Sequence, residues 1–199
     1  MLPIIKKTLT NFLLFFLSSF IFSESKDISI VIHGGAGWFS SMTEEEISGI
    51  ESALNKAADL GYKVMLEGGT SLDAVEQAII ILENNPLFNA GKGSVYTSEL
   101  KQEMDASIMD GSNLDAGAVA SVTSVKNPIT LARHVMENTE HVMFSSIGAE
   151  KVAKEAGLEI VSPSYFYSEE KLQRAKKRIK ADAKTVSYTH LTLPTMIGV

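Results

Sequence analysis

The sequence predicts an α/β domain, because stretches with the periodicity of strands alternate with stretches with the periodicity of helices. Residues 28–33, "ISIVIH", are rich in β-branched side chains and predict a strand buried on both faces. Two amphipathic segments follow at 43–66 and 70–83, and two further strand patterns lie at 104–109 and 115–125. With 199 residues, of which 45% are hydrophobic and 21% charged, the chain is long enough for one globular domain with its own core.

The first two helices carry their own start and stop signals. Thr43 with Glu46 forms a capping box, and Gly68-Gly69 ends that helix. Thr70 caps the second helix, which Asn84-Asn85-Pro86 ends. One apolar face is predicted for each helix. The faces consist of Ile47, Ile50, Leu54, Ala57, Ala58, Gly61 and Met65 in the first, and Val75, Ala78, Ile79 and Leu82 in the second.

The middle of the chain predicts a pair of strands followed by helices. Residues 104–109 alternate apolar and polar side chains, which is typical of a half-buried strand that closes in the turn at Gly111. The stretch "DAGAVASVTSV" predicts a second strand, whose small side chains allow another element to pack closely on it. Pro128 suits the first position of a helix, and further helices are predicted at 145–156 and 169–183.

Charge and targeting signals limit the function. The net charge of −6, without a basic patch before residue 170, excludes a nucleic-acid-binding protein, and the absence of cysteine excludes disulfides and thiol nucleophiles. Residues 1–25 read as a secretory signal peptide, with Lys6 and Lys7 before an apolar run too short to span a membrane comfortably. An uncleaved anchor is the alternative. We therefore expect an exported protein, periplasmic or extracellular, without a membrane attachment once the signal is removed.

The stretch "NPLFNAGKGSVYT" (Asn85–Thr97) raises the possibility of a phosphate-binding loop. A P-loop requires a glycine where Pro86 stands and a Ser or Thr where Gly93 stands, and it follows a strand rather than a helix. "HGGAGW" at 33–38 is not a dinucleotide fingerprint. It is similar to the oxyanion segment of lipases, but the chain has no G-x-S-x-G elbow. Neither glycine-rich stretch therefore predicts a nucleotide or lipase site.

The other polar residues point more to structural roles than to catalysis. The four histidines lack metal-ligand spacing, and His33 suits a hydrogen-bonded imidazole at a strand end. Asp105, Asp110 and Asp115 fit turns and solvated faces better than paired acid–base catalysis. On the residues alone, the chain is an exported α/β domain with a glycine-rich segment after its first strand.

Eight motifs in register between residues 28 and 168 resemble the first subunit of the plant-type (type 2) asparaginase and isoaspartyl peptidase family, of the N-terminal nucleophile (Ntn) hydrolases. They are "IHGGAG", "LEGGTSLDAVEQAI", "NPLFNAGKGSVYT", "MDASIMDG", "LDAGAVASV", "NPITLARHVMENTEHVM", "GAEKVAKEAGL" and "VSPSYFYSEE". The resemblance implies the N-terminal half of a four-layer αββα sandwich, made as a precursor that cleaves itself into two subunits. It also implies a small-molecule substrate, L-asparagine or a β-aspartyl dipeptide, a missing second (β) subunit, and a dimer of such αβ units.

The resemblance also assigns roles to individual residues. The nucleophile is the threonine that autoproteolysis frees at the start of the second subunit, with its own α-amine as base. Asn89 matches the family residue that reaches the neighbourhood of the nucleophile, although a turn-forming role is the alternative. Gly34 and Gly35 match the glycines beside the scissile segment. No catalytic cofactor is implied. A structural sodium ion is implied, held by the main-chain carbonyls of Leu82, Glu83, Asn85, Phe88, Ala90 and Lys92.

The C-terminal residues depart from the family pattern. The family's Gly-Thr-Val-Gly cleavage site is absent, because Thr185-Val186 follows Lys184 and precedes "SYTHLTLPTMIGV". We therefore expect a signal peptide at 1–25, a first-subunit region at 26–185 and a non-native tail at 186–199. On this interpretation the chain is a hydrolase fragment without its nucleophile and is inactive by itself. The alternative is a non-catalytic exported binding domain built on the same half-fold.

Overall fold

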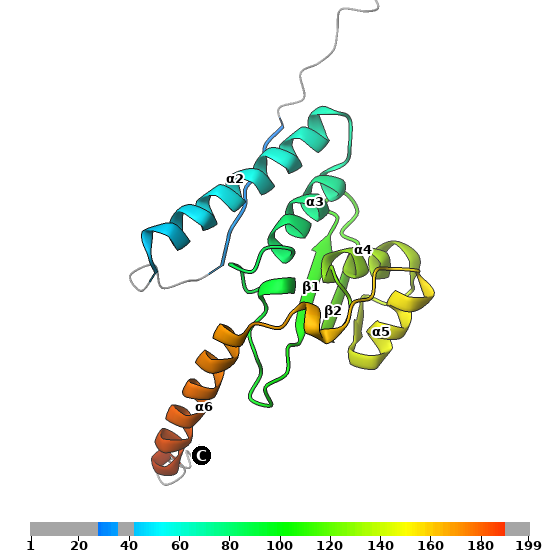
Figure 1. The fold of residues 1–199 in the computed structure, drawn as a ribbon. Coiled ribbons are helices and arrows are strands. Elements are labelled where there is room, and N and C mark those ends of the chain that lie inside the picture. The colour runs from blue at the N-terminus through cyan, green and yellow to red at the C-terminus, as the bar shows by residue number, and fades with distance from the viewer. Residues whose placement is uncertain (1–27, 36–41, 190–199) are drawn as a thin grey trace, which may run out of the picture.

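The structure is a computed structural model that describes residues 28–35 and 42–189, with side chains described as far as residue 181. Figure 1 shows a pair of long helices, a small sheet covered by two shorter helices, and a last helix that stands away from the body. The elements, in chain order, are α2 (Glu44–Leu66), α3 (Ser71–Glu83), the 3-10 turn η2 (Gly91–Gly93), β1 (Met104–Met109), β2 (Ala116–Val122), α4 (Pro128–Asn138), β3 (Met143–Ser145), α5 (Ser146–Glu155), the 3-10 turn η3 (Pro163–Tyr165) and α6 (Glu169–Thr189).

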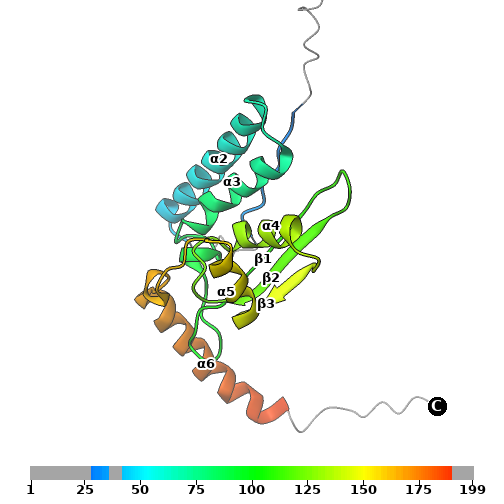
Figure 2. The ribbon, with the colours of Figure 1, turned by 90° about the vertical axis from the view of Figure 1, so that its right-hand side faces the viewer.

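Helices α2 and α3 lie side by side (Figure 2), and both begin with the predicted capping residues. The Thr43 hydroxyl accepts from the backbone N–H of Glu46 at 3.1 Å, while the Glu46 carboxylate accepts from the Thr43 N–H at 2.8 Å. Thr70 and Asp73 form the same reciprocal pair. Because each pair satisfies two otherwise free N–H groups, the starts of both helices are fixed locally.

The inward face predicted for α3 is wrong at Val75, which is 42% exposed. Ala78 and Leu82 are buried as expected. The difference arises because α3 is covered on two sides: Ala78 packs in a cluster with residues of α2, whereas Glu76 and Glu83 face α4. Val75 lies on the remaining side, which faces solvent.

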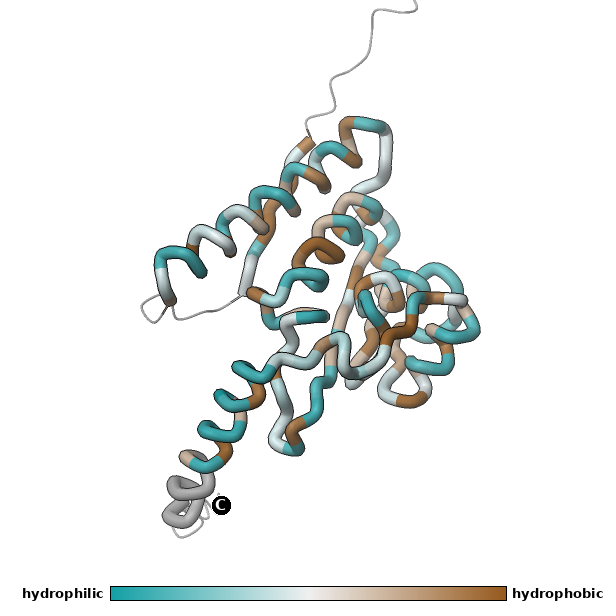
Figure 3. Tube along the Cα trace, in the orientation of Figure 1, coloured by the Kyte–Doolittle hydropathy of each residue, from teal (hydrophilic) through white to brown (hydrophobic). Residues whose placement is uncertain are grey.

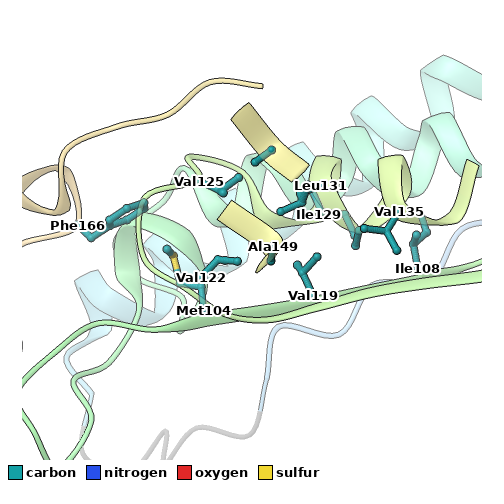
Figure 4. Packing of buried hydrophobic residues seen from close by; sticks show 12 residues of the cluster. Met104, Ile108, Val119, Val122, Val125, Ile129, Leu131, Val135, Ala149 and Phe166 are labelled. Atoms are coloured by element: carbon teal, nitrogen blue, oxygen red, sulfur yellow. The ribbon is translucent and has the colours of Figure 1, made fainter. Parts of the chain in front are cut away.

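The sheet has the order β1-β2-β3, with β2 antiparallel to β1 and parallel to β3. Helices α4 and α5 cover one face of the sheet. There, buried side chains from β1, β2, α4 and α5 form the main hydrophobic cluster (Figure 4). Gly117 of β2 lies directly under α4, and a β-carbon there would meet the Ala132 carbonyl oxygen at 2.1 Å. This close approach confirms the expectation from the small side chains of "DAGAVASVTSV" and the helix that Pro128 opens.

No helix or strand in the described part of the chain is packed on the opposite face of the sheet. Strand pairing places Ser107, Ala118 and Met143 in one row across this face, next to Met109 and its partner Ala116. Met109 and Met143 are 57% and 55% exposed. This face therefore presents small and apolar side chains to solvent.

The first strand prediction differs from the structure. Residues 28–35 are not part of a sheet, and Val31 is 94% exposed, whereas Ile30 and Ile32 pack against the cluster between α2 and α3. The segment is thus buried on one side only. The physical reason is that no strand in the described part of the chain pairs with it, so its outer side faces solvent.

Acidic and basic side chains, buried or partly exposed, join α3 to α4. The Glu83 carboxylate accepts from the backbone N–H of Ile129 at 2.9 Å and from the Asn127 amide at 3.0 Å. Asn127 itself gives α4 no side-chain cap, so Glu83 takes that role from a distance. Burial raises the pKa of Glu83 to about 7, although these hydrogen bonds act in the opposite sense. Arg133 of α4 completes the link through ion pairs with Asp73 and Glu76.

Helix α6 extends from residue 169 to 189, six residues beyond the predicted end, and Figure 3 shows that the part of it coloured by hydropathy is mostly hydrophilic. Among the described residues, no helix is long and apolar enough to cross a membrane. The predicted signal peptide at 1–25 lies outside the described residues, as do residues 190–199 of the predicted tail.

We predict a specific acid sensitivity at Asp73. Hydrogen bonds from the N–H and hydroxyl of Thr70, followed by Arg133, lower the pKa of Asp73 to about 2 from an ordinary value of 3.8. Its contribution to the free energy of unfolding is therefore complete above pH 4 and is lost as the pH falls towards 2. Because its side chain is 38% exposed, we expect Asp73→Asn to cost only about 1 kcal/mol at neutral pH.

Urea unfolding of both proteins between pH 7 and pH 2 measures this difference. The gap between wild type and Asp73→Asn should close below pH 4, while Asp59→Asn, an exposed site on α2, should leave unfolding unchanged throughout. A gap that stays constant down to pH 2 would contradict the role of Asp73.

Candidate functional site

A cavity of about 610 Å³ lies between residues 32–35, α2, the loop after α3 and the first turns of α6. Gly34, Gly35 and Asn89, the three residues expected to support an active site, all line it. They come from segments more than 50 positions apart in the sequence. The structure therefore brings the predicted residues together, although their roles in catalysis stay a prediction.

Asn89 belongs to the segment Asn85–Thr97, which we call the glycine loop. Its side-chain oxygen accepts from the backbone N–H of Val95 at 2.9 Å, which closes the loop on itself. That bond fixes which end of the amide is the oxygen, because the backbone group can only donate. No described residue accepts from the Asn89 side-chain N–H groups. The side-chain oxygen of Asn89 thus stabilises the turn, while its two side-chain N–H groups remain available as donors at the cavity.

The glycine loop folds back so tightly that two of its positions exclude a side chain. A β-carbon at Gly93 would lie 1.9 Å from the Phe88 carbonyl oxygen and 2.7 Å from that of Pro86. Gly91 has a φ of 47° and would bring a β-carbon within 2.3 Å of the Glu83 carbonyl oxygen. Backbone carbonyls from the end of α3 and from the loop itself are therefore gathered in a small volume.

The six carbonyls predicted to bind sodium belong to this packed region. Those of Leu82, Asn85 and Ala90 accept backbone hydrogen bonds from Asn85, Phe88 and Gly93. The other three, of Glu83, Phe88 and Lys92, accept none from the described residues. Each carbonyl oxygen has two lone pairs, so all six keep acceptor capacity. The donor set, neutral oxygens only, suits a hard monovalent cation. Whether such an ion binds stays a prediction.

Lys92 does not contribute to the cavity. Its ammonium nitrogen lies 5.4 Å from the centre of the Tyr165 ring, within range of a cation–π contact. The single turn η2 leads to Tyr96, which forms a β-bridge with Gln102, and not into a long helix. The structure therefore agrees with the exclusion of a phosphate-binding loop.

The cavity wall formed by α6 is cationic, which the sequence did not indicate. Lys171, Arg174 and Arg178 line the cavity at helical spacing around the buried Ala175. Arg174 pairs with Glu170 at 2.6 Å, and burial lowers the pKa of Lys171. One helical face carries residues 171, 174, 175 and 178. The same spacing of charged residues also occurs on helices that face only solvent. Nothing in it identifies the partner of that face.

The remaining candidates have structural roles, as expected. The Asp105 carboxylate accepts from the Ser121 N–H, and that of Asp110 accepts from the Ser112 N–H in the turn between β1 and β2. The imidazole of His33 accepts from the Gly35 N–H at 3.2 Å. Within the described ranges, no group of three or more His, Cys, Asp or Glu side chains could hold a metal ion.

Comparison with known proteins shows one consistent similarity. A family model described as "Asparaginase" matches residues 26–195. The chain is 46% identical over 150 residues to a plant-type L-asparaginase of Pyrococcus horikoshii, covering 75% of this chain and 47% of that protein. It is 41% and 42% identical over 158 residues to isoaspartyl peptidase/L-asparaginases of Danio rerio and Xenopus laevis, covering 79% of this chain and 50% of each relative. The chain spans about half the length of the curated relatives it matches.

We predict that the glycine loop does not tolerate a side chain at position 93. Gly93→Ala must displace the Phe88 and Pro86 carbonyls, and overpacking of this kind costs about 2 to 3 kcal/mol. Gly111→Ala is the matched control, because a β-carbon there has no neighbour within 4 Å. Thermal unfolding followed by circular dichroism compares the two. Equal midpoints for both variants would show that the loop is not packed as described.

Proposed function

Because the chain belongs to the plant-type asparaginase and isoaspartyl peptidase family of Ntn hydrolases, we propose that it forms the first-subunit half of such an enzyme. The complete enzyme would hydrolyse L-asparagine to aspartate and ammonia, and would cleave β-aspartyl dipeptides. The observation that carries the proposal is the convergence of Gly34, Gly35 and Asn89 on one cavity.

This half would form part of the pocket around the nucleophile, and the nucleophile itself would come from the second half. An N-terminal threonine of the second half would attack the substrate amide, with its own α-amine as general base. The unpaired side-chain N–H groups of Asn89 are suitable donors to that threonine or to an oxygen that becomes negative during attack. Gly34 and Gly35 have no side chains to obstruct a chain segment that lies beside them.

The second half would cover the surfaces that are open here. The sheet face with Met109 and Met143 and the outer side of residues 28–33 both present apolar groups to solvent. Covering them with a second sheet would give the four-layer αββα arrangement, and two such units would form the dimer. Both assemblies are part of the proposal, as is export directed by residues 1–25.

We also propose that the glycine loop holds a structural sodium ion. The residues present fit it, because six main-chain carbonyls with acceptor capacity lie at the end of α3 and in the packed loop. The ion would fix the backbone near Asn89 and would take no part in the reaction. Potassium is larger, so a loop this compact should prefer sodium.

We predict that sodium stabilises the protein. Raising sodium chloride against a background of tetramethylammonium chloride at constant ionic strength should raise the thermal midpoint, since a ligand bound only by the native state stabilises it in proportion to RT ln(1 + [L]/Kd). The gain would reach about 2.7 kcal/mol at a hundredfold excess over Kd. Gly93→Ala should abolish the response. Identical melting curves in the two salts would contradict a sodium site.

The function is tested by adding the missing half. We expect the 199-residue chain alone to release no ammonia from L-asparagine. A chimera of residues 26–185 with the second half of the Pyrococcus horikoshii relative should cleave itself into two fragments and then hydrolyse L-asparagine and β-aspartyl dipeptides. Gel electrophoresis detects the cleavage, and coupled assays detect ammonia and aspartate.

Variants of the chimera separate the role of Asn89 in catalysis from its role in the turn. Asn89→Ala should lower turnover more than it lowers the thermal midpoint, whereas Asn113→Ala, in the exposed turn between β1 and β2, should leave turnover unchanged. Ammonia release by the 199-residue chain that Thr185→Ala abolishes would overturn the proposal, because Thr185 would then be the nucleophile.

A further inference from the structure

The ammonium group of Lys171 lies among backbone carbonyls of the glycine loop. Its Nζ donates to the Pro86 carbonyl at 2.8 Å and also to the Gly93 carbonyl, across 85 and 78 positions of sequence. These two acceptors lie on either side of Asn89, three residues before it and four residues after it. Lys171 thus bridges the two arms of the loop that presents Asn89 to the cavity.

The surroundings of this ammonium are those of a cation site. Lys171 is half-buried, and no carboxylate of a described residue lies within 4.0 Å of its Nζ. A charge removed from water without a counter-ion needs strong hydrogen bonds, and here neutral carbonyl oxygens provide them. We call the Pro86 and Gly93 carbonyls that accept from Lys171 the carbonyl cradle. The cradle is rigid because Gly93 packs against the Pro86 and Phe88 carbonyls with no space for a β-carbon.

Two neutral hydrogen bonds hold the segment before α6 to the same loop. The Tyr96 hydroxyl accepts from the backbone N–H of Ser168 at 3.2 Å. The Gln102 amide donates at 2.8 Å both to the Phe166 carbonyl and to the Ser94 carbonyl. These bonds place the first turn of α6 next to the cradle. The side chain of Lys171 therefore needs to span only a short distance to the two carbonyls.

We propose that Lys171 is a positioning residue of the candidate site, whose ammonium acts as a tethered monovalent cation and holds the two arms of the glycine loop around Asn89. Its acceptors, Pro86 and Gly93, are distinct from the six carbonyls assigned to sodium. The structural role stands on the hydrogen bonds alone. Only its consequence for turnover rests on the proposed function.

Hydrogen exchange of the 199-residue chain tests the structural role without any activity. Lys171→Ala should speed amide exchange in the glycine loop by about tenfold or more, as expected when charge-assisted hydrogen bonds are lost. Propylammonium chloride should restore protection, because its ammonium can occupy the cradle. Tetramethylammonium chloride at the same concentration should not, because it has no N–H groups to donate.

Two further variants complete this test. Lys171→Arg keeps the charge and the donors and should retain most of the protection. Lys101→Ala removes an exposed lysine that pairs only with Glu99 and should leave the loop unchanged. Wild-type exchange rates in Lys171→Ala, or equal rescue by the two ammonium salts, would overturn the proposal. If Lys171→Ala does not fold, propylammonium should restore its folding, and failure to do so would equally overturn it.

The chimera tests the consequence for turnover. Lys171→Ala should lower kcat with little change in KM, and both Lys171→Arg and propylammonium should restore kcat. If the chimera is inactive, the proposed function fails, while the exchange experiment still decides the role of Lys171. If the chimera is active and kcat is unaffected by Lys171→Ala, the positioning role is wrong.

Discussion

The close packing of the glycine loop on its own backbone is the constraint on which the candidate site depends. Gly91 and Gly93 lie so near the carbonyls of Glu83 and Phe88 that neither position has space for a side chain. Where carbonyl groups are packed this densely, the nearby N–H groups are too few to satisfy all of them. A cation, whether bound from solvent or carried on a side chain, is the natural partner for such oxygens. The position of Asn89 follows from this arrangement.

Glu83 extends the same constraint to the rest of the fold. Its carbonyl packs on Gly91, and its carboxylate accepts from the backbone N–H of Ile129 in the first turn of α4. One residue therefore connects the loop beside the cavity with the helix that covers the sheet. Removing only the carboxylate would leave the buried N–H of Ile129 without an acceptor, which is costly. The contacts of Glu83 thus connect the candidate site to the helix that covers the main hydrophobic cluster, although the two clusters of buried side chains are separate.

Local signals in the sequence predicted most of the elements but not the contacts between distant segments. The helix caps at Thr43 and Thr70, the strand patterns at 104–109 and 115–125 and the helix at Pro128 depend on neighbouring residues. The structure has all of them, with the second strand shortened to 116–122. The convergence of Gly34, Gly35 and Asn89 followed from family resemblance. Lys171 could not be predicted, because an ammonium that binds main-chain carbonyls leaves no complementary side chain to recognise. The exposure of Val31 was missed because a β-branched run does not reveal whether partner strands exist.

The hydrogen bonds that join α6 to the glycine loop come from Lys171, in the first turn of the helix. Its 21 residues would span about 31 Å, so a tilt of about 10° at the first turn moves the far end by about 5 Å. Figures 1 and 2 both show the helix standing away from the body beyond that turn. The contacts of the first turn therefore set the direction of the whole helix. The Lys171 ammonium, together with the hydrogen bonds of Ser168 and Phe166, therefore fixes the direction of a helix much longer than the contacts that hold it.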